Sequence, residues 1–140
     1  MQELSFLYTL DEIDHAAKQV VEHAGSVRIW LFLGDMGAGK TTLIKSISEQ
    51  LGATGEFSSP TYSLANEYPL TKGKIAHLDL YRLRSLDEAL DIGIEDYLFG
   101  SSYCFVEWSQ LIMPLLKKGE FLTVQIESIS ESQRKITIFM

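Results

Sequence analysis

The run GDMGAGKT at residues 34–41 constrains this chain more than any other feature, because it fills every fixed position of the P-loop pattern G-x-x-x-x-G-K-S/T. Residues 27–33 before it are mostly apolar, as in a buried strand, and residues 42–51 after it carry apolar side chains at helical spacing. A glycine-rich loop between a strand and a helix presents backbone N–H groups and partial positive charge to phosphate. The pattern therefore predicts a site for a nucleoside triphosphate.

Four residues of this loop have specific predicted roles. Gly34 and Gly39 are expected to adopt backbone angles closed to other residues and to let the phosphates approach closely. Lys40 provides a positive charge for the β- and γ-phosphates, and the hydroxyl of Thr41 provides a ligand for Mg²⁺. The backbone N–H groups of residues 36–40 are expected to point into the phosphate-binding concavity.

Composition limits the class of protein. With 140 residues and 46% hydrophobic content, residues 1–140 are expected to form one domain with its own core. The net charge of −7 argues against direct binding of nucleic acid, which requires clustered Lys and Arg. The longest apolar run is too short to span a bilayer and no basic, apolar leader is present, so we expect a cytoplasmic protein without membrane contact. Cys104, the only cysteine, lies in an apolar run and is expected to be a buried, inert thiol.

Hydrophobic periodicity predicts an alternation of strands and helices. Strands are expected at residues 3–8, 27–33, 62–68, 74–81, 103–108, 121–126 and 134–139, and helices at residues 9–24, 42–51, 85–92 and 94–99, with a short helical segment around Pro114. A strand, P-loop and helix followed by an apolar strand that ends in an acid predicts an α/β, P-loop NTPase-like fold. Two expected hairpins make the central sheet mixed, with helices flanking it.

Two acids are candidates for a Walker-B-type role, in which a carboxylate fixes Mg²⁺ or orients the attacking water. Glu107 follows the apolar residues 103–106, and Asp79 follows residues 74–78. The alternative for each is an ordinary carboxylate at the end of a strand. Two aromatic residues beside these acids, Trp108 and Tyr81, fit core packing better than a ligand platform on residue type alone.

The reaction class is narrowed by what the sequence lacks. The only asparagine is Asn66, so the guanine-binding signature of small GTPases is absent and ATP is the favoured nucleotide. The four arginines are scattered, whereas a metabolite kinase usually clusters Arg around the transferred phosphoryl group. A small-molecule kinase is therefore an alternative to an ATPase. A second alternative is a nucleotide-sensing interaction subunit with negligible turnover.

Four blocks carry a resemblance to a known family: residues 34–43, the SPTYSL run at 59–64, the HLDLYRL run at 77–83 and VEW at 106–108. With these blocks in order, the chain resembles the TsaE (YjeE) family over nearly its whole length. These ATPases serve the formation of threonylcarbamoyladenosine in bacterial tRNA together with the proteins TsaD and TsaB. The resemblance implies a Mg²⁺-dependent ATP hydrolase, slow alone, that couples energy to this complex or switches it and reaches tRNA only through its partners.

The resemblance also assigns candidate residues. Lys40, Asp79 and Glu107 are the implied catalytic residues, and Thr41 and Glu107 the implied ligands of Mg²⁺. Residues 59–61 are implied to form a switch-like loop. An adenine contact is implied for residues 9–10 and Arg134, and no catalytic role is placed on Gln110, where many relatives have Glu. The expected ATP-binding residues are Gly34, Asp35, Met36, Gly37, Ala38, Gly39, Lys40, Thr41, Thr42, Thr61 and Trp108.

Overall fold

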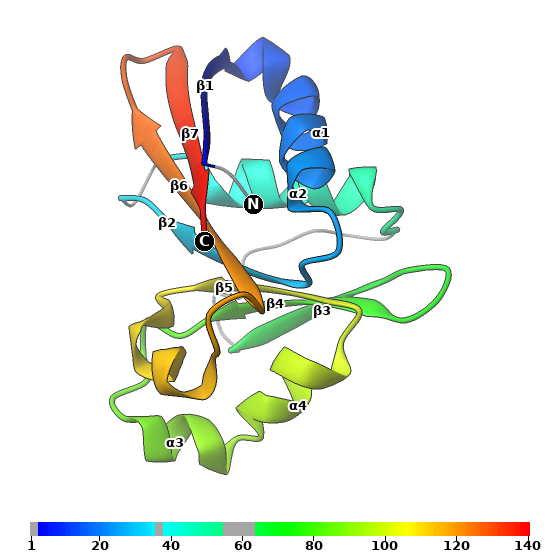
Figure 1. Cartoon of the computed structure of the whole chain (residues 1–140), viewed down its shortest axis with the longest axis vertical. Helices are drawn as coiled ribbons and strands as arrows, with labels where there is room; N and C mark the ends of the chain where they lie inside the picture. Colours follow the sequence, from blue (N-terminus) through cyan, green and yellow to red (C-terminus); the bar gives the residue numbers. More distant parts are fainter. Residues whose placement is uncertain (1–2, 36–37, 55–63) are drawn as a thin grey trace.

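A mixed β-sheet forms the centre of the protein. The computed structural model describes residues 3–35, 38–54 and 64–140. Within these residues the sheet has seven strands in the order β1-β7-β6-β2-β5-β4-β3 (Figure 1). The strands are β1 (Leu4–Thr9), β2 (Ile29–Leu33), β3 (Ala65–Pro69), β4 (Lys74–Asp79), β5 (Tyr103–Glu107), β6 (Phe121–Ser128) and β7 (Gln133–Phe139).

The direction of each strand follows from its connections. The strands β2, β4, β5 and β6 are parallel to their neighbours in this set, because helical connections return the chain to the same edge of the sheet. The short turns after β3 and β6 make the pairs β3–β4 and β6–β7 antiparallel hairpins. The first strand, β1, then joins β7 in antiparallel register. The predicted mixed α/β sheet is confirmed.

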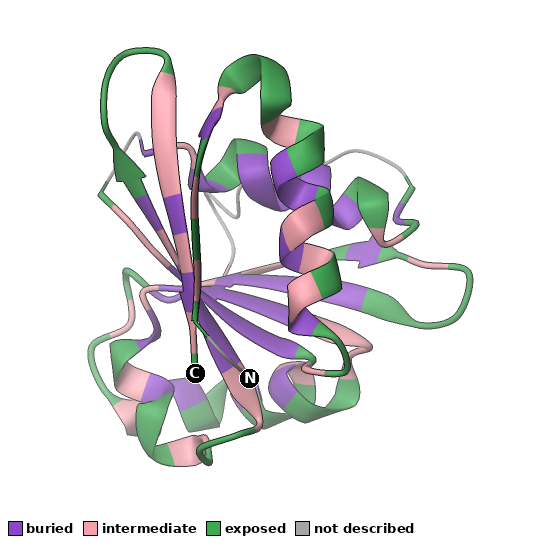
Figure 2. Ribbon diagram, turned by 45° about the horizontal axis from the view of Figure 1, so that its top comes forward, coloured by how far each residue is buried: buried purple, intermediate pink, exposed green. Residues whose placement is uncertain are grey.

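Helices cover the sheet on both faces (Figures 1 and 2). The helices α1 (Ile13–Ala24) and α2 (Lys40–Gln50) pack on one face, where Trp30, Phe32 and Phe105 join their core. The helices α3 (Leu86–Asp91) and α4 (Ile94–Gly100) and the 3₁₀ segment η2 (Ser109–Leu115) share the second core with alternate strand residues. Successive strand side chains point to opposite faces, so each central strand contributes to both cores.

The ends of the elements have local causes. The carboxylate of Glu12 accepts hydrogen bonds from the backbone N–H and the hydroxyl of Thr9, and the first turn after Thr9 is the 3₁₀ segment η1 (Leu10–Glu12) rather than α-helix. The hydroxyl of Ser85 accepts the N–H of Glu88 and starts α3 as predicted. The strand β4 ends at Asp79, two residues earlier than predicted, and β6 continues two residues further, to Ser128.

The single cysteine lies in the second core. Cys104 is 1% exposed, and burial raises the pKa of its thiol to about 12. A thiol with this pKa stays protonated near neutral pH, so the predicted inert cysteine agrees with the structure. In the part of the chain that the structure describes, no helix combines the length and the apolar character needed to cross a membrane.

Candidate functional site

The predicted phosphate site lies where β2 leads into α2. Gly39 has a φ of 101° and directly precedes Lys40, the first residue of the helix. The first bond at this end runs from the N–H of Leu43 to the carbonyl of Gly39 at 3.1 Å. Helix geometry therefore leaves the N–H groups of residues 40–42 without partners inside the helix. Such groups at a helix N-terminus favour an anion.

One bond in the loop differs from the prediction. The N–H of Ala38 donates to the carbonyl of Asp35 at 2.9 Å, so this group already has a partner instead of pointing into an open concavity. Met36, Gly37 and Thr61, together with the rest of the predicted switch-like loop at 59–61, lie outside the described residues.

Gly34 lies against the neighbouring strand. A Cβ atom at this position would be 2.8 Å from the backbone carbonyl oxygen of Ile126 in β6, closer than real Cβ atoms approach an oxygen. Only glycine, which has no Cβ, lets the loop leave β2 this close to β6.

We expect Gly34→Ala to lower the free energy of unfolding by about 1–3 kcal/mol, because either β6 or the loop must shift. Nucleotide affinity should fall as well, since the loop carries the predicted phosphate site. Chemical denaturation and equilibrium binding of an ATP analogue measure the two effects. The matched control is Gly100→Ala, where an added Cβ meets no atom within 4 Å. Equal stability of the two variants would contradict the close packing of Gly34.

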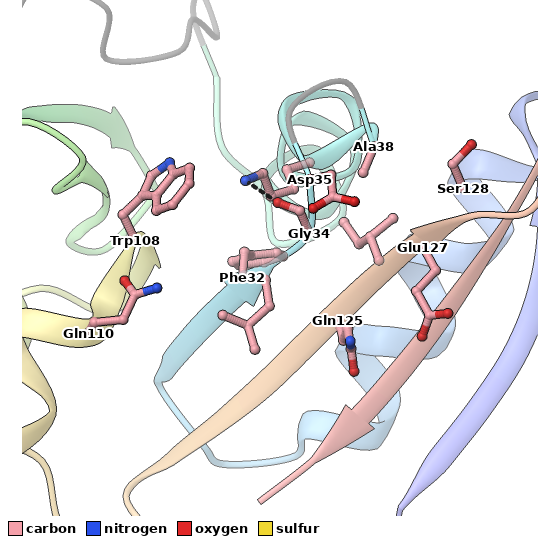
Figure 3. Close-up of a pocket in the computed structure, with 12 residues that line it drawn as sticks. Phe32, Gly34, Asp35, Ala38, Trp108, Gln110, Gln125, Glu127 and Ser128 are labelled. Carbon is pink, nitrogen blue, oxygen red and sulfur yellow. Dashed lines mark hydrogen bonds between the residues drawn. The ribbon is translucent and has the colours of Figure 1, made fainter.

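Lys40 connects the loop to the end of β5. Its side chain is 10% exposed, and Nζ donates a hydrogen bond of 2.8 Å to the carbonyl of Gly34 (Figure 3). The same nitrogen is 3.7 Å from Oε1 of Glu107 and 5.3 Å from the ring centroid of Trp108. The lysine of the loop and one predicted acid are therefore neighbours.

A buried hydrogen-bonded pair supports Glu107. Its second carboxylate oxygen, Oε2, lies 2.7 Å from Nε2 of His77, and Nδ1 of that ring lies 3.0 Å from the hydroxyl of Tyr68. His77 has no role among the residues predicted for the site. The available signal was a histidine inside the apolar strand β4, two residues before Asp79 and therefore on the same face.

Asp79 lies beside Glu107. The parallel register of β4 and β5 pairs these two residues at the carboxyl ends of their strands. Oδ1 of Asp79 also accepts the N–H of Tyr81 at 3.0 Å, so the carboxylate closes the turn after β4. The two predicted acids are thus neighbours, although only Glu107 contacts Lys40 among the bonds of the described residues.

The two aromatic residues beside the acids differ in burial, since Tyr81 is exposed and Trp108 is half-buried against the second core. Tyr81 is 61% exposed, and its ring centroid is 4.9 Å from that of the half-buried Trp108. Trp108 has a φ of 56°, a left-handed conformation that is costly for a bulky residue and is often found at functional sites. The core interpretation is wrong for Tyr81, whereas Trp108 packs against the second core with part of its surface exposed.

A cavity of about 680 Å³ opens beside the loop. Trp108 and Gln110 line one side, and Gln125, Glu127 and Ser128 of β6 line the other (Figure 3). Its lining also includes the phosphate-loop residues Gly34, Asp35, Ala38 and Lys40. The space is therefore continuous with the predicted phosphate site.

Arg134 reaches the loop from the other hairpin. Its Nε donates to the carbonyl of Ala38 at 3.1 Å, and its charge partly opposes the rise that burial causes in the pKa of Tyr8. The register of β1 and β7 places Thr9 next to this position, opposite Gln133. Both segments named for an adenine contact thus lie at one end of the sheet, and the contact itself stays a prediction.

The donors near the loop fit a hard cation. Thr41, an exposed residue at the start of α2, carries a hydroxyl, and Glu107 carries carboxylate oxygens. Mg²⁺ prefers such oxygen ligands. Among residues 3–35, 38–54 and 64–140, no group of three or more His, Cys, Asp or Glu is placed to hold a metal. An ion here would take its other ligands from phosphate and water, as Mg²⁺ usually does.

Comparisons with known proteins agree on one family. The family model described as "Threonylcarbamoyl adenosine biosynthesis protein TsaE" matches residues 7–136. The chain is 39% identical over 104 residues to a protein of Bacillus subtilis and 33% identical over 129 residues to one of Rickettsia felis, both described as tRNA threonylcarbamoyladenosine biosynthesis protein TsaE. The first match covers 74% of this chain and 64% of the relative, and the second 91% and 74%.

A third relative and a solved structure complete the comparison. The TsaE protein of Haemophilus influenzae is 42% identical over 89 residues, which are 64% of this chain and 56% of that protein. The chain thus spans less than two thirds of the Bacillus and Haemophilus relatives. The crystal structure of YdiB from Bacillus subtilis superposes with a TM-score of 0.75 at 28% identity, covering 98% of this chain and 84% of that one.

Proposed function

The chain belongs to the TsaE family of threonylcarbamoyl adenosine biosynthesis proteins, and on this premise we propose that it is a slow, Mg²⁺-dependent ATPase of that tRNA modification. The observation that carries the proposal is the position of Lys40. It stands at the start of α2 with its ammonium 3.7 Å from Glu107. A cation and an acid thus face each other beside a helix N-terminus.

Each residue has a role in this proposal. The N–H groups of residues 40–42 bind phosphate oxygens, and Lys40 exchanges the carbonyl of Gly34 for the β- and γ-phosphates. Glu107 and the Thr41 hydroxyl would hold Mg²⁺, which would neutralise charge on the phosphates. Asp79 lies beside Glu107 and is proposed to orient the attacking water.

The proposal includes partners and place of action. We infer that the chain works in the cytoplasm with TsaD and TsaB, and that ATP hydrolysis couples energy to their complex or switches it. The net charge of −7 supports indirect contact with tRNA, because direct binding to a phosphate backbone rests on clustered positive charge.

The experiment is phosphate release from Mg-ATP by the full chain, measured alone and with TsaB and TsaD. We expect slow release alone and faster release with both partners. Transfer of phosphate to a small molecule would instead indicate a kinase. Nucleotide binding without release in any combination would indicate a sensing subunit, and either result would contradict the proposed ATPase.

Binding to tRNA tests the indirect contact. We expect the isolated chain to bind tRNA weakly at physiological salt, and its binding to the TsaD–TsaB pair to differ between an ATP analogue and ADP. Filter binding measures the first and surface plasmon resonance the second. Two results together would contradict the indirect contact. The chain alone would bind tRNA tightly and in a salt-sensitive way, and its affinity for the TsaD–TsaB pair would be the same with the ATP analogue and with ADP.

A further inference from the structure

A buried chain of hydrogen bonds leads from the edge hairpin to the P-loop lysine. It runs from the Tyr68 hydroxyl through both ring nitrogens of His77 to Oε2 of Glu107, while Oε1 faces Lys40. Resting on the proposed function, we propose that His77 is a positioning residue, which holds Oε2 of Glu107 so that Oε1 stays directed at the phosphate and Mg²⁺ site.

Because His77 and Glu107 are buried, the carboxylate of Glu107 depends on its hydrogen-bond and ion-pair partners. The side chain of His77 is 1% exposed and that of Glu107 is 6% exposed. A buried carboxylate is costly unless each oxygen has a partner. Glu107 satisfies this condition with two different partners, because His77 is 2.7 Å from one oxygen and Lys40 is 3.7 Å from the other. Oε2 is therefore held by His77, and Oε1 is the oxygen that faces Lys40.

The carboxylate of Glu107 determines which nitrogen of a neutral His77 ring carries the proton, because an ionised carboxylate only accepts hydrogen bonds. The hydroxyl of Tyr68, 3.0 Å from Nδ1, donates to that nitrogen when the ring is neutral with its proton on Nε2. The Nε2–H group then donates to the carboxylate of Glu107. The opposite tautomer would leave the lone pair of Nε2 against a carboxylate oxygen. The Nε2–H group is therefore directed at Glu107, and Nδ1 accepts from the hydroxyl of Tyr68, which supports this tautomer.

The histidine becomes more important once Lys40 has moved. In the proposed function Lys40 turns from Glu107 to the phosphates, so the carboxylate loses one of its two partners. His77 comes from β4 and does not belong to the loop or to α2, so its bond to Oε2 can remain. Without it, the carboxylate is free to rotate about its side-chain bonds. Groups that orient a metal ligand in this way typically change metal affinity by about 10- to 100-fold.

The test compares His77→Leu, which removes the donor, with His77→Gln, whose amide N–H group is able to donate to Glu107. Binding of a fluorescent ATP analogue is measured in EDTA and across a MgCl₂ titration, and phosphate release is measured in the same titration with the partners. We expect His77→Leu to raise the required Mg²⁺ concentration by about 10- to 100-fold, with binding in EDTA unchanged. His77→Gln should recover part of the loss.

Two further variants keep the test decisive. Tyr68→Phe removes one hydroxyl and should raise the Mg²⁺ requirement by about three- to tenfold, as expected for one hydrogen bond, and it replaces His77→Leu if that variant fails to fold. His15→Leu, at an exposed histidine of α1, should leave the Mg²⁺ requirement unchanged.

The outcomes separate positioning from general support. A folded His77→Leu variant with the parental Mg²⁺ requirement would overturn the proposal. Equal losses in His77→Leu and His77→Gln that include binding in EDTA would overturn it too, because they indicate a purely structural histidine. Failure of the proposed ATPase is visible separately, since the parent protein would then release no phosphate.

Discussion

Replacing Lys40 with alanine is expected to reduce ATP turnover on the order of 10²- to 10³-fold, the loss typical when a positioned charge is removed from a transition state. Its ammonium is the cation that the structure places next to both the loop carbonyl of Gly34 and the acid Glu107. No other described lysine or arginine side chain forms an ion pair with Glu107. Phosphate release in the presence of the partners measures the loss.

The stability of this variant needs a separate measurement. Lys40 is nearly buried, so its removal leaves the carbonyl of Gly34 and one oxygen of Glu107 without this partner, at a cost of about 1–3 kcal/mol. The control is Lys45→Ala, an exposed lysine of the same helix, which should keep parental turnover and stability. A folded Lys40→Ala protein with parental turnover would refute the ATPase role of the P-loop.

The elements with a local signal could be predicted from the sequence. Three kinds of signal depend on only a few neighbouring residues: the helical spacing of apolar residues in α1, its end at Gly25, and the caps at Thr9 and Ser85. The structure has each of them where predicted. The P-loop was found for the same reason, since its motif is contiguous. The predicted and observed elements differ at their ends, as in the 3₁₀ turn before α1. Alternative hydrogen bonds at such ends differ little in energy, and neighbouring residues alone do not determine which one forms.

The arrangement around Glu107 could not be predicted in the same way. His77 and Tyr68 lie far from Glu107 in the chain. Tyr68 contacts His77, and His77 contacts Glu107, only because β4 pairs with β3 on one side and with β5 on the other. Strand order and register depend on the packing of the whole sheet, which one sequence does not reveal. Tyr81 was misjudged because residue type favours burial, whereas the turn closed by Asp79 places it in solvent.

Replacing each acid with its amide, which removes the charge but keeps the shape, should affect Mg²⁺ binding differently at Glu107 and at Asp79. We expect Glu107→Gln to lower turnover by at least about tenfold and to weaken Mg²⁺ binding, because an amide is a poor ligand in place of a carboxylate. Its fold should persist, since the amide oxygen can still accept from His77 and Lys40 keeps its hydrogen bond to the carbonyl of Gly34. Magnesium titrations of ATP-analogue binding and of phosphate release measure both effects.

Asp79→Asn should lower turnover by at least about tenfold while the Mg²⁺ requirement stays parental, since the proposed role of this carboxylate is to orient water. The turn after β4 should survive, because the amide oxygen of asparagine can still accept the N–H of Tyr81. Any loss of turnover then reports the missing charge and not a disturbed turn. Parental hydrolysis by Asp79→Asn in the full complex would show that Asp79 serves only this turn and would leave Glu107 as the one acid of the site.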